Sequence, residues 1–153
     1  MPKIKSLVKK LRDTYPQFVF KEAESFSWSP RKNTIFYSLN GDCSYLLHEL
    51  AHALLGHVDY EYDIELIPME RDAWNVAAEL SAGFGVQIDE DLIESNLDSY
   101  RDWMHSRSTC PHCSANGLQI KKRAYKCPAC SQSWRVNDAR ICGLKRYKIQ
   151  PKN

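Results

Sequence analysis

The stretch that decides the fold is HELAHALLGH, residues 48–57, which places three histidines within ten positions. His48 and His52 are four residues apart, so on a helix their side chains point within about 40° of each other and can bind one metal ion. Glu49 directly follows the first histidine. This arrangement is typical of zinc sites in which two imidazoles bind the metal and the glutamate accepts a proton from the attacking water.

The residues around this motif predict a buried helix. Asn40-Gly41-Asp42 punctuates the chain, and Asp42 is the expected N-cap of a helix from Cys43 to about His57. Apolar residues occupy nearly every side of that helix, which indicates burial. Cys43 is expected to pack close to the motif.

A catalytic zinc site of this kind takes a third protein ligand and keeps one position open. His57 is the nearest candidate, but on a continued helix it points about 140° away from His52. In the metzincin pattern a glycine and a last histidine follow the second histidine by three and six residues, whereas Gly56 and His57 follow by four and five. We therefore treat His57 as a weaker alternative and expect it near the helix end.

The next predicted helix, residues 68–86, offers a better third ligand. Glu70 shares a helical stripe with Ala73 and Ala77, whose small side chains allow the zinc helix to approach closely. Asp72 falls roughly 160° away from Glu70 and is expected to face solvent. Because a carboxylate on a buried stripe needs a compensating charge, which zinc provides, Glu70 is the favoured third ligand.

Four of the six cysteines form a second motif. Cys110-Pro-His-Cys113 and Cys127-Pro-Ala-Cys130 are separated by 13 residues, a spacing slightly shorter than that of most two-knuckle zinc sites. Four thiolates predict a tetrahedral structural zinc, which a module this small needs in order to fold. Paired C-x-x-C motifs also favour a reducing compartment, so a cytoplasmic location is expected.

The charges of the chain are divided unevenly. The net charge is +2 over 153 residues, but residues 1–105 carry a net −8 (10 Lys+Arg, 18 Asp+Glu) and residues 106–153 a net +10 (11 Lys+Arg, 1 Asp). This division predicts two domains with different partners, the second suited to polyanions. The same basic residues are equally compatible with docking on the acidic domain.

The basic domain interleaves cationic and aromatic residues, a pattern found where proteins bind nucleic acid. Its aromatic residues either stack on bases or form the small core of the domain. The candidate nucleic-acid-binding residues are Lys121, Lys122, Arg123, Lys126, Arg135, Lys145 and Arg146.

The remaining patterns predict an α+β fold. Ile4, Leu7, Val8 and Leu11 mark an amphipathic first helix, and short strands are expected at 17–20, 25–28 and 33–39. A helix is expected over 89–105. The strand at 33–39 is a candidate edge for pairing with an extended peptide. No apolar run reaches the roughly 18 residues of a membrane span, and no membrane partner is expected.

The two helix motifs resemble those of the ImmA/IrrE-type metallopeptidases, over roughly residues 35–90. The carrying residues are His48-Glu49-Leu50-Ala51-His52 and the E-x-x-A-x-x-x-A pattern from Glu70 to Ala77. The resemblance implies a small zincin-like fold, zinc held by His48, His52 and Glu70, and Glu49 as the general base. It also implies cleavage of intracellular regulators such as repressors.

The order of a peptidase domain and a zinc ribbon also resembles the SprT-type proteases, which act on proteins crosslinked to DNA. That family takes a third zinc histidine from further downstream, in a context that His57, His105 and His112 do not match. We therefore expect a cytoplasmic metallopeptidase with one catalytic and one structural zinc. The alternatives are a SprT-like protease and a non-enzymatic regulator that binds nucleic acid.

Overall fold

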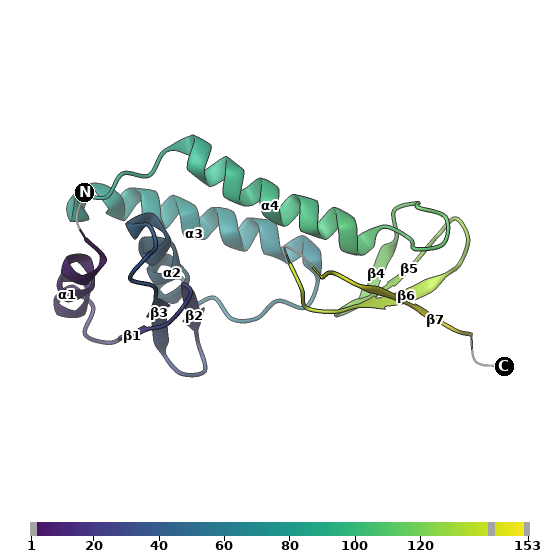
Figure 1. Ribbon diagram of the computed structural model, residues 1–153, viewed down its shortest axis with the longest axis horizontal. Coiled ribbons are helices and arrows are strands. Elements are labelled where there is room, and N and C mark those ends of the chain that lie inside the picture. Colours follow the sequence, from purple (N-terminus) through teal and green to yellow (C-terminus); the bar gives the residue numbers. More distant parts are fainter. Residues whose placement is uncertain (1–2, 141–142, 152–153) are drawn as a thin grey trace. The chain divides into compact units, whose positions relative to one another are not determined.

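The computed structural model describes residues 3–140 and 143–151 (Figure 1). The described part is a mixed α+β protein with four α-helices and two small sheets, as the sequence predicts at this coarse level. Cys142 lies outside the described residues. None of the described helices combines the length and hydrophobicity that crossing a bilayer requires.

The chain folds into two compact units. The first comprises Met1–Asp59 with Pro68–Glu94, and the second comprises Tyr60–Ile67 with Ser95–Asn153. The second unit thus takes in more of the chain than the expected module of residues 106–153, and it is assembled from two separate stretches.

The first unit opens with a helix whose apolar stripe is buried as its spacing predicts. Its elements, in chain order, are α1 (Ile4–Thr14), β1 (Val19–Glu22), β2 (Ser27–Ser29), β3 (Thr34–Tyr37), α2 (Cys43–Leu54), most of α3 (Leu66–Ser81), the short 3-10 helix η2 (Ala82–Phe84) and the first turn of α4 (Glu90–Ser108).

Strand β3 is the central strand of the three-stranded sheet, not an edge. It pairs in parallel with β1, with Phe20 opposite Ile35, and antiparallel with β2, with Trp28 opposite Ile35. The hypothesis that β3 offers its edge to a peptide is therefore wrong. Its nearly continuous burial, at Thr34, Ile35 and Tyr37, is the pattern of a strand covered on both faces.

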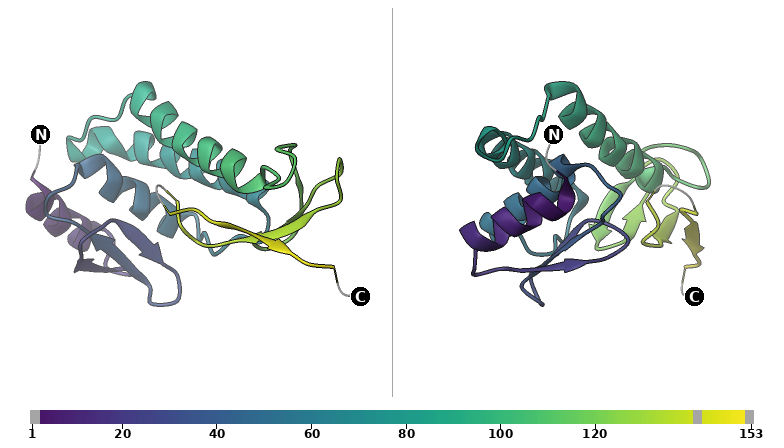
Figure 2. Two further views of the ribbon diagram at one scale, coloured as in Figure 1. Left: turned by 45° about the vertical axis from the view of Figure 1, so that its right-hand side comes forward. Right: turned by 60° about the vertical axis from the view of Figure 1, so that its left-hand side comes forward.

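Helix α2 lies between the three-stranded sheet and α3 (Figure 2). Asp42 caps it as predicted, because its side chain accepts a hydrogen bond from the Ser44 N–H at 2.8 Å. The helix ends at Leu54, three residues earlier than expected. Gly56 adopts a left-handed φ of +68° there, a conformation that ends helices and that glycine adopts at little cost.

The second unit is built around a four-stranded antiparallel sheet and most of α4. Tyr125 and Trp134 are fully buried, and their rings stack with centroids 5.6 Å apart. These two aromatics therefore form the core of the unit and are closed to bases. The elements are the 3-10 helix η1 (Asp63–Glu65), β4 (Leu118–Lys121), β5 (Ala124–Lys126), β6 (Ser133–Val136) and β7 (Arg146–Ile149), in the sheet order β4-β5-β6-β7.

A buried ionic cluster fastens the segment 60–67 inside the second unit. Asp63 accepts a short hydrogen bond from the Tyr125 hydroxyl, and the Nε of Arg107 lies 3.5 Å from the same carboxylate. The Asp63 N–H donates to Gln119 at 2.7 Å. Asp63 and Arg107 are both buried, so each needs the other as a counter-charge. The sequence gives no sign of this pairing, because 44 positions separate the two residues.

The N-cap of α2 is open to a direct test. We expect Asp42→Ala to lower the free energy of unfolding by about 1 kcal/mol, since the Ser44 N–H loses its acceptor. Urea denaturation followed by circular dichroism measures the change. The control is Glu24→Ala, an exposed position for which we expect a change within about 0.5 kcal/mol. Equal unfolding midpoints for the two variants would contradict the capping role.

Candidate metal centres

The first candidate centre is formed by one turn of α2 and one residue of α3. His48 and His52 are 3% and 8% exposed, and their Nε2 atoms lie 3.1 Å apart. Glu70 is 6% exposed, with one carboxylate oxygen 2.8 Å from His48 Nε2 and the other 3.3 Å from His52 Nε2. The three side chains therefore direct two nitrogens and a carboxylate toward one point, and their ligand atoms all lie within 4.8 Å of one another.

Helical phase explains why Glu70 joins this group. Ala73 and Ala77 on the same stripe are fully buried, and their small side chains let α3 approach α2. Asp72, on the opposite side of α3, is exposed. The structure thus places Glu70 beside the histidines and leaves Asp72 at the surface, as the spacing predicts.

The electrostatics of the centre keep Glu70 ionised. Burial raises the pKa of this carboxyl, but hydrogen bonds from His48 and His52 outweigh burial and lower the pKa from 4.5 to about 2. The pKa of His48 is lowered chiefly by burial, which favours the neutral imidazole, the form that can bind a metal. Burial also acts to lower the pKa of His52, but contacts with Glu70 and the charge of Glu49 raise it.

Glu49 lies at the border of the centre. Its side chain is half-buried, and its charge is close enough to raise the pKa of His52. The side chain thus lies within electrostatic range of one histidine of the group and remains partly open to water.

His57 lies closer to the centre than continued helical geometry predicts. Because α2 ends at Leu54 and Gly56 is left-handed, the chain folds back, and His57 Nδ1 comes to 2.8 Å from Nδ1 of His52. That nitrogen is on the side of the His52 ring away from His48 and Glu70. His57 therefore contacts a member of the group without joining it. A glycine just before the third histidine was the signal in the sequence for this return.

The donor set of the first centre fits zinc. Two imidazole nitrogens and one carboxylate are the protein ligands of catalytic zinc sites that keep a fourth position open. The ring of His48 is also held firmly, because it stacks on Trp74 with centroids 4.1 Å apart and planes inclined by 20°.

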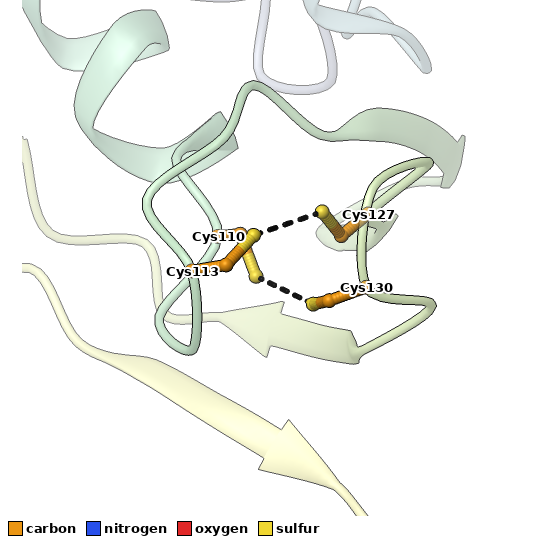
Figure 3. Close-up of side chains that lie close together, drawn as sticks. All are labelled: Cys110, Cys113, Cys127 and Cys130. Carbon is orange, nitrogen blue, oxygen red and sulfur yellow. Dashed lines mark hydrogen bonds between the residues drawn. The ribbon is translucent and has the colours of Figure 1, made fainter.

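The second candidate centre is the group of four cysteines in the second unit (Figure 3). The sulfur of Cys110 lies 3.6 Å from that of Cys130, and the sulfurs of Cys113 and Cys127 are 3.5 Å apart. Four thiol groups at these separations match the tetrahedral thiolate set of a structural zinc. His112 is exposed and takes no part in the group.

The two cysteine turns have the same backbone conformation. Ser114 N–H donates to Cys110 O at 3.0 Å, and Ser131 N–H donates to Cys127 O at the same distance. Ser114 and Ser131 both have a φ near +65°, a left-handed conformation that is uncommon outside glycine. The repeat of this conformation in both turns is what brings the four sulfurs together.

Backbone amides also favour the thiolate form of Cys110. Burial raises the pKa of this thiol, but hydrogen bonds from the N–H groups of Cys113 and His112 outweigh it and lower the pKa to about 6. The turn thus prepares the sulfur for metal binding.

Only some of the predicted nucleic-acid-binding residues of the second unit line a common groove. A groove of about 590 Å³ is lined by cationic side chains of β4, of the turn between β4 and β5, and of β6, and by the exposed Tyr147 of β7. Of the seven predicted residues, the lining includes Lys121, Lys122, Arg123 and Arg135 but not Lys126, Lys145 or Arg146.

No family model, curated protein or solved structure matches this chain in the comparisons with known proteins. The resemblances to the ImmA/IrrE-type and SprT-type families therefore rest on the motif residues alone and stay predictions.

The role of Glu70 can be tested by metal content. We expect the dialysed wild-type protein to hold two zinc ions per chain and Glu70→Gln to hold one, because the neutral amide removes the charge that balances the metal. Elemental analysis by mass spectrometry gives the count. Asp72→Asn is the matched control, since it makes a similar change on the exposed side of the same helix. Two zinc ions in Glu70→Gln would exclude Glu70 as a required ligand.

Proposed function

We propose that this protein is a zinc-dependent metallopeptidase that cleaves an intracellular protein. The observation that carries the proposal is the convergence of His48 Nε2, His52 Nε2 and the Glu70 carboxylate, with Glu49 half-buried at its border. The proposal includes a zincin-like fold for the first unit. The resemblance to the ImmA/IrrE-type family supports it and suggests a regulator of the repressor type as the substrate.

In this proposal the chain divides the chemistry among four side chains. His48, His52 and Glu70 hold the metal, and a zinc ion bound there would lower the pKa of water and polarise the scissile carbonyl. Glu49 accepts the proton of the attacking water and then delivers it to the nitrogen of the leaving amine. The intermediate exposure of Glu49, which leaves it in contact with water, supports this role.

Strand β2, rather than β3, is the proposed binding edge for an extended substrate. In the sheet order β1-β3-β2, only one side of β2 is paired with another strand of its sheet. The Trp28 indole N–H donates to the carbonyl of His57 at 3.0 Å, which ties β2 to the chain just beyond the zinc helix. A peptide that adds to this edge would therefore bind next to the candidate centre.

The competing function is a regulator in which both zinc ions are structural. Glu49 discriminates between the two, because a closed structural site has no use for a carboxylate base beside an open position. Metal content is the same in both cases and does not separate them.

The decisive variant is Glu49→Gln. We expect it to retain two zinc ions while cleavage falls by about 10²–10⁴-fold, since the amide cannot accept the proton from water. The assay uses fluorescein-labelled casein together with a proteome-derived peptide library whose cleavage products are identified by mass spectrometry. Glu79→Gln, an exposed position on α3, is the control and should cleave as the wild type does. Equal cleavage by Glu49→Gln and the wild type would contradict the peptidase proposal.

We also propose, as a second function, that the ribbon binds single-stranded nucleic acid in the groove on its sheet. The guanidinium of Arg135 lies 4.5 Å over the ring of Tyr147, which is 39% exposed, so the groove offers one aromatic face and one planar cation for stacking. Arg123 pairs with Asp138, but the pair is exposed and contributes little, so a phosphate can displace the carboxylate. This function would favour a protease that acts on DNA-bound proteins.

Lys121→Ala tests the groove against Lys126→Ala, an exposed lysine of the same sheet that does not line it. We expect Lys121→Ala to weaken binding of a fluorescent single-stranded oligonucleotide and to reduce the slope of log K against log salt by about 0.7. Fluorescence anisotropy at several salt concentrations measures both quantities. If the two variants behave alike, binding does not use the groove.

A further inference from the structure

The chain just beyond the end of α2 places the imidazole of His57 beside Nδ1 of His52, the ring nitrogen that faces away from His48 and Glu70. The N–H of His57 donates to the carbonyl of His52 at 3.0 Å, and the N–H of Gly56 donates to that of Ala53 at 3.1 Å, which together make a Schellman motif. The indole N–H of Trp28, on β2, donates a hydrogen bond to the His57 carbonyl. The backbone of His57 is therefore fixed at two points.

These contacts bring the imidazole rings of His52 and His57 within hydrogen-bonding distance of each other. The Nδ1 atoms of His52 and His57 are 2.8 Å apart, and the ring centroids are 5.1 Å apart with planes inclined by 59°. Two nitrogens at this distance share one hydrogen, so one ring donates and the other accepts.

Which ring donates this hydrogen bond depends on the role of the second nitrogen of His52, Nε2. Its Nε2 lies 3.1 Å from Nε2 of His48 and 3.3 Å from the Glu70 carboxylate, so Nε2 is the nitrogen that faces the metal position. To bind a metal, Nε2 must carry a free lone pair, and the neutral ring then carries its hydrogen on Nδ1. With a metal at Nε2, His52 would therefore be the donor and Nδ1 of His57 the acceptor.

We propose that His57 is a positioning residue that holds His52 in the tautomer and orientation required for zinc binding at Nε2. This inference rests on the proposed zinc site but not on its catalytic activity. In metal sites the outer hydrogen bond of a histidine ligand commonly goes to a carboxylate or a backbone carbonyl, and its loss weakens metal binding by about 10–100-fold. In this chain a second imidazole fills that place.

The two histidine ligands are consequently held by different means. Nδ1 of His48 is buried and has no hydrogen-bond partner among the described residues, so its ring is oriented by stacking on Trp74. His52 has its hydrogen bond to His57. Loss of the His57 acceptor is therefore expected to affect only one of the two ligands.

The test compares His57→Phe, which keeps a ring but removes the acceptor, with His57→Asn, whose side-chain oxygen restores one. Zinc affinity of the full-length protein is measured by competition with a chromogenic chelator. Glu70→Gln, which is expected to keep only the four-cysteine site, gives the contribution of that site alone. We expect His57→Phe to bind zinc at the first centre about 10–100-fold more weakly and His57→Asn to bind within a few-fold of the wild type. His105→Phe, a change of an exposed histidine on α4, should leave the affinity unchanged.

Wild-type affinity in His57→Phe would overturn the proposal. Equal weakening in His57→Phe and His57→Asn would overturn it too, because ring packing and not an acceptor would then be what matters.

A second measurement needs no variant. In the zinc-loaded wild-type protein, nitrogen-15 NMR should show His52 protonated at Nδ1 and His57 protonated at Nε2, and the opposite tautomer of His57 would overturn the proposal. Neither experiment involves a substrate, so the peptidase proposal can fail in the Glu49→Gln assay while the role of His57 stands.

Discussion

The contact between the Glu70 carboxylate and two imidazoles is the constraint on which the first unit depends. A carboxylate that is 6% exposed must be offset by donors or by a cation, and the Nε2 atoms of His48 and His52 are the groups that face it. That requirement fixes the rotation of α3 about its own axis. It also explains why alanines, at 73 and 77, occupy the stripe between the two helices.

The two centres solve different problems of stability. The first lies in a unit with a larger apolar core, which includes Leu46, Leu50 and Trp74, so burial contributes much of the stability of that unit. The second unit has a core of only a few side chains, centred on the stacked Tyr125 and Trp134, and its four sulfurs lie in two turns of matching conformation. Small domains of this kind commonly require a metal for folding, so the four-cysteine group is best understood as part of the framework.

Features set by local periodicity could be predicted from the sequence. Helical phase selected Glu70 over Asp72, and the Asp42 cap follows from residue type and position. Features set by tertiary pairing could not be predicted in this way. The central place of β3 depends on which strands pair with it. The return of the chain at His57 is local and is marked by Gly56, but the contact of its ring with His52 depends on how the side chains are placed. Whether an aromatic of the ribbon is core or surface likewise depends on which face of the sheet is covered.

The discontinuous second unit has a consequence for the order in which the chain can fold as it leaves the ribosome. All residues of the first unit have been synthesised by Glu94, so His48, His52 and Glu70 can come together early. The segment 60–67 must wait longer, because Arg107 and Tyr125, which enclose Asp63, are translated some 40 to 60 residues later. During that interval the carboxylate of Asp63, just before α3 in the chain, is exposed to solvent. It can be buried only after the last third of the chain has been synthesised.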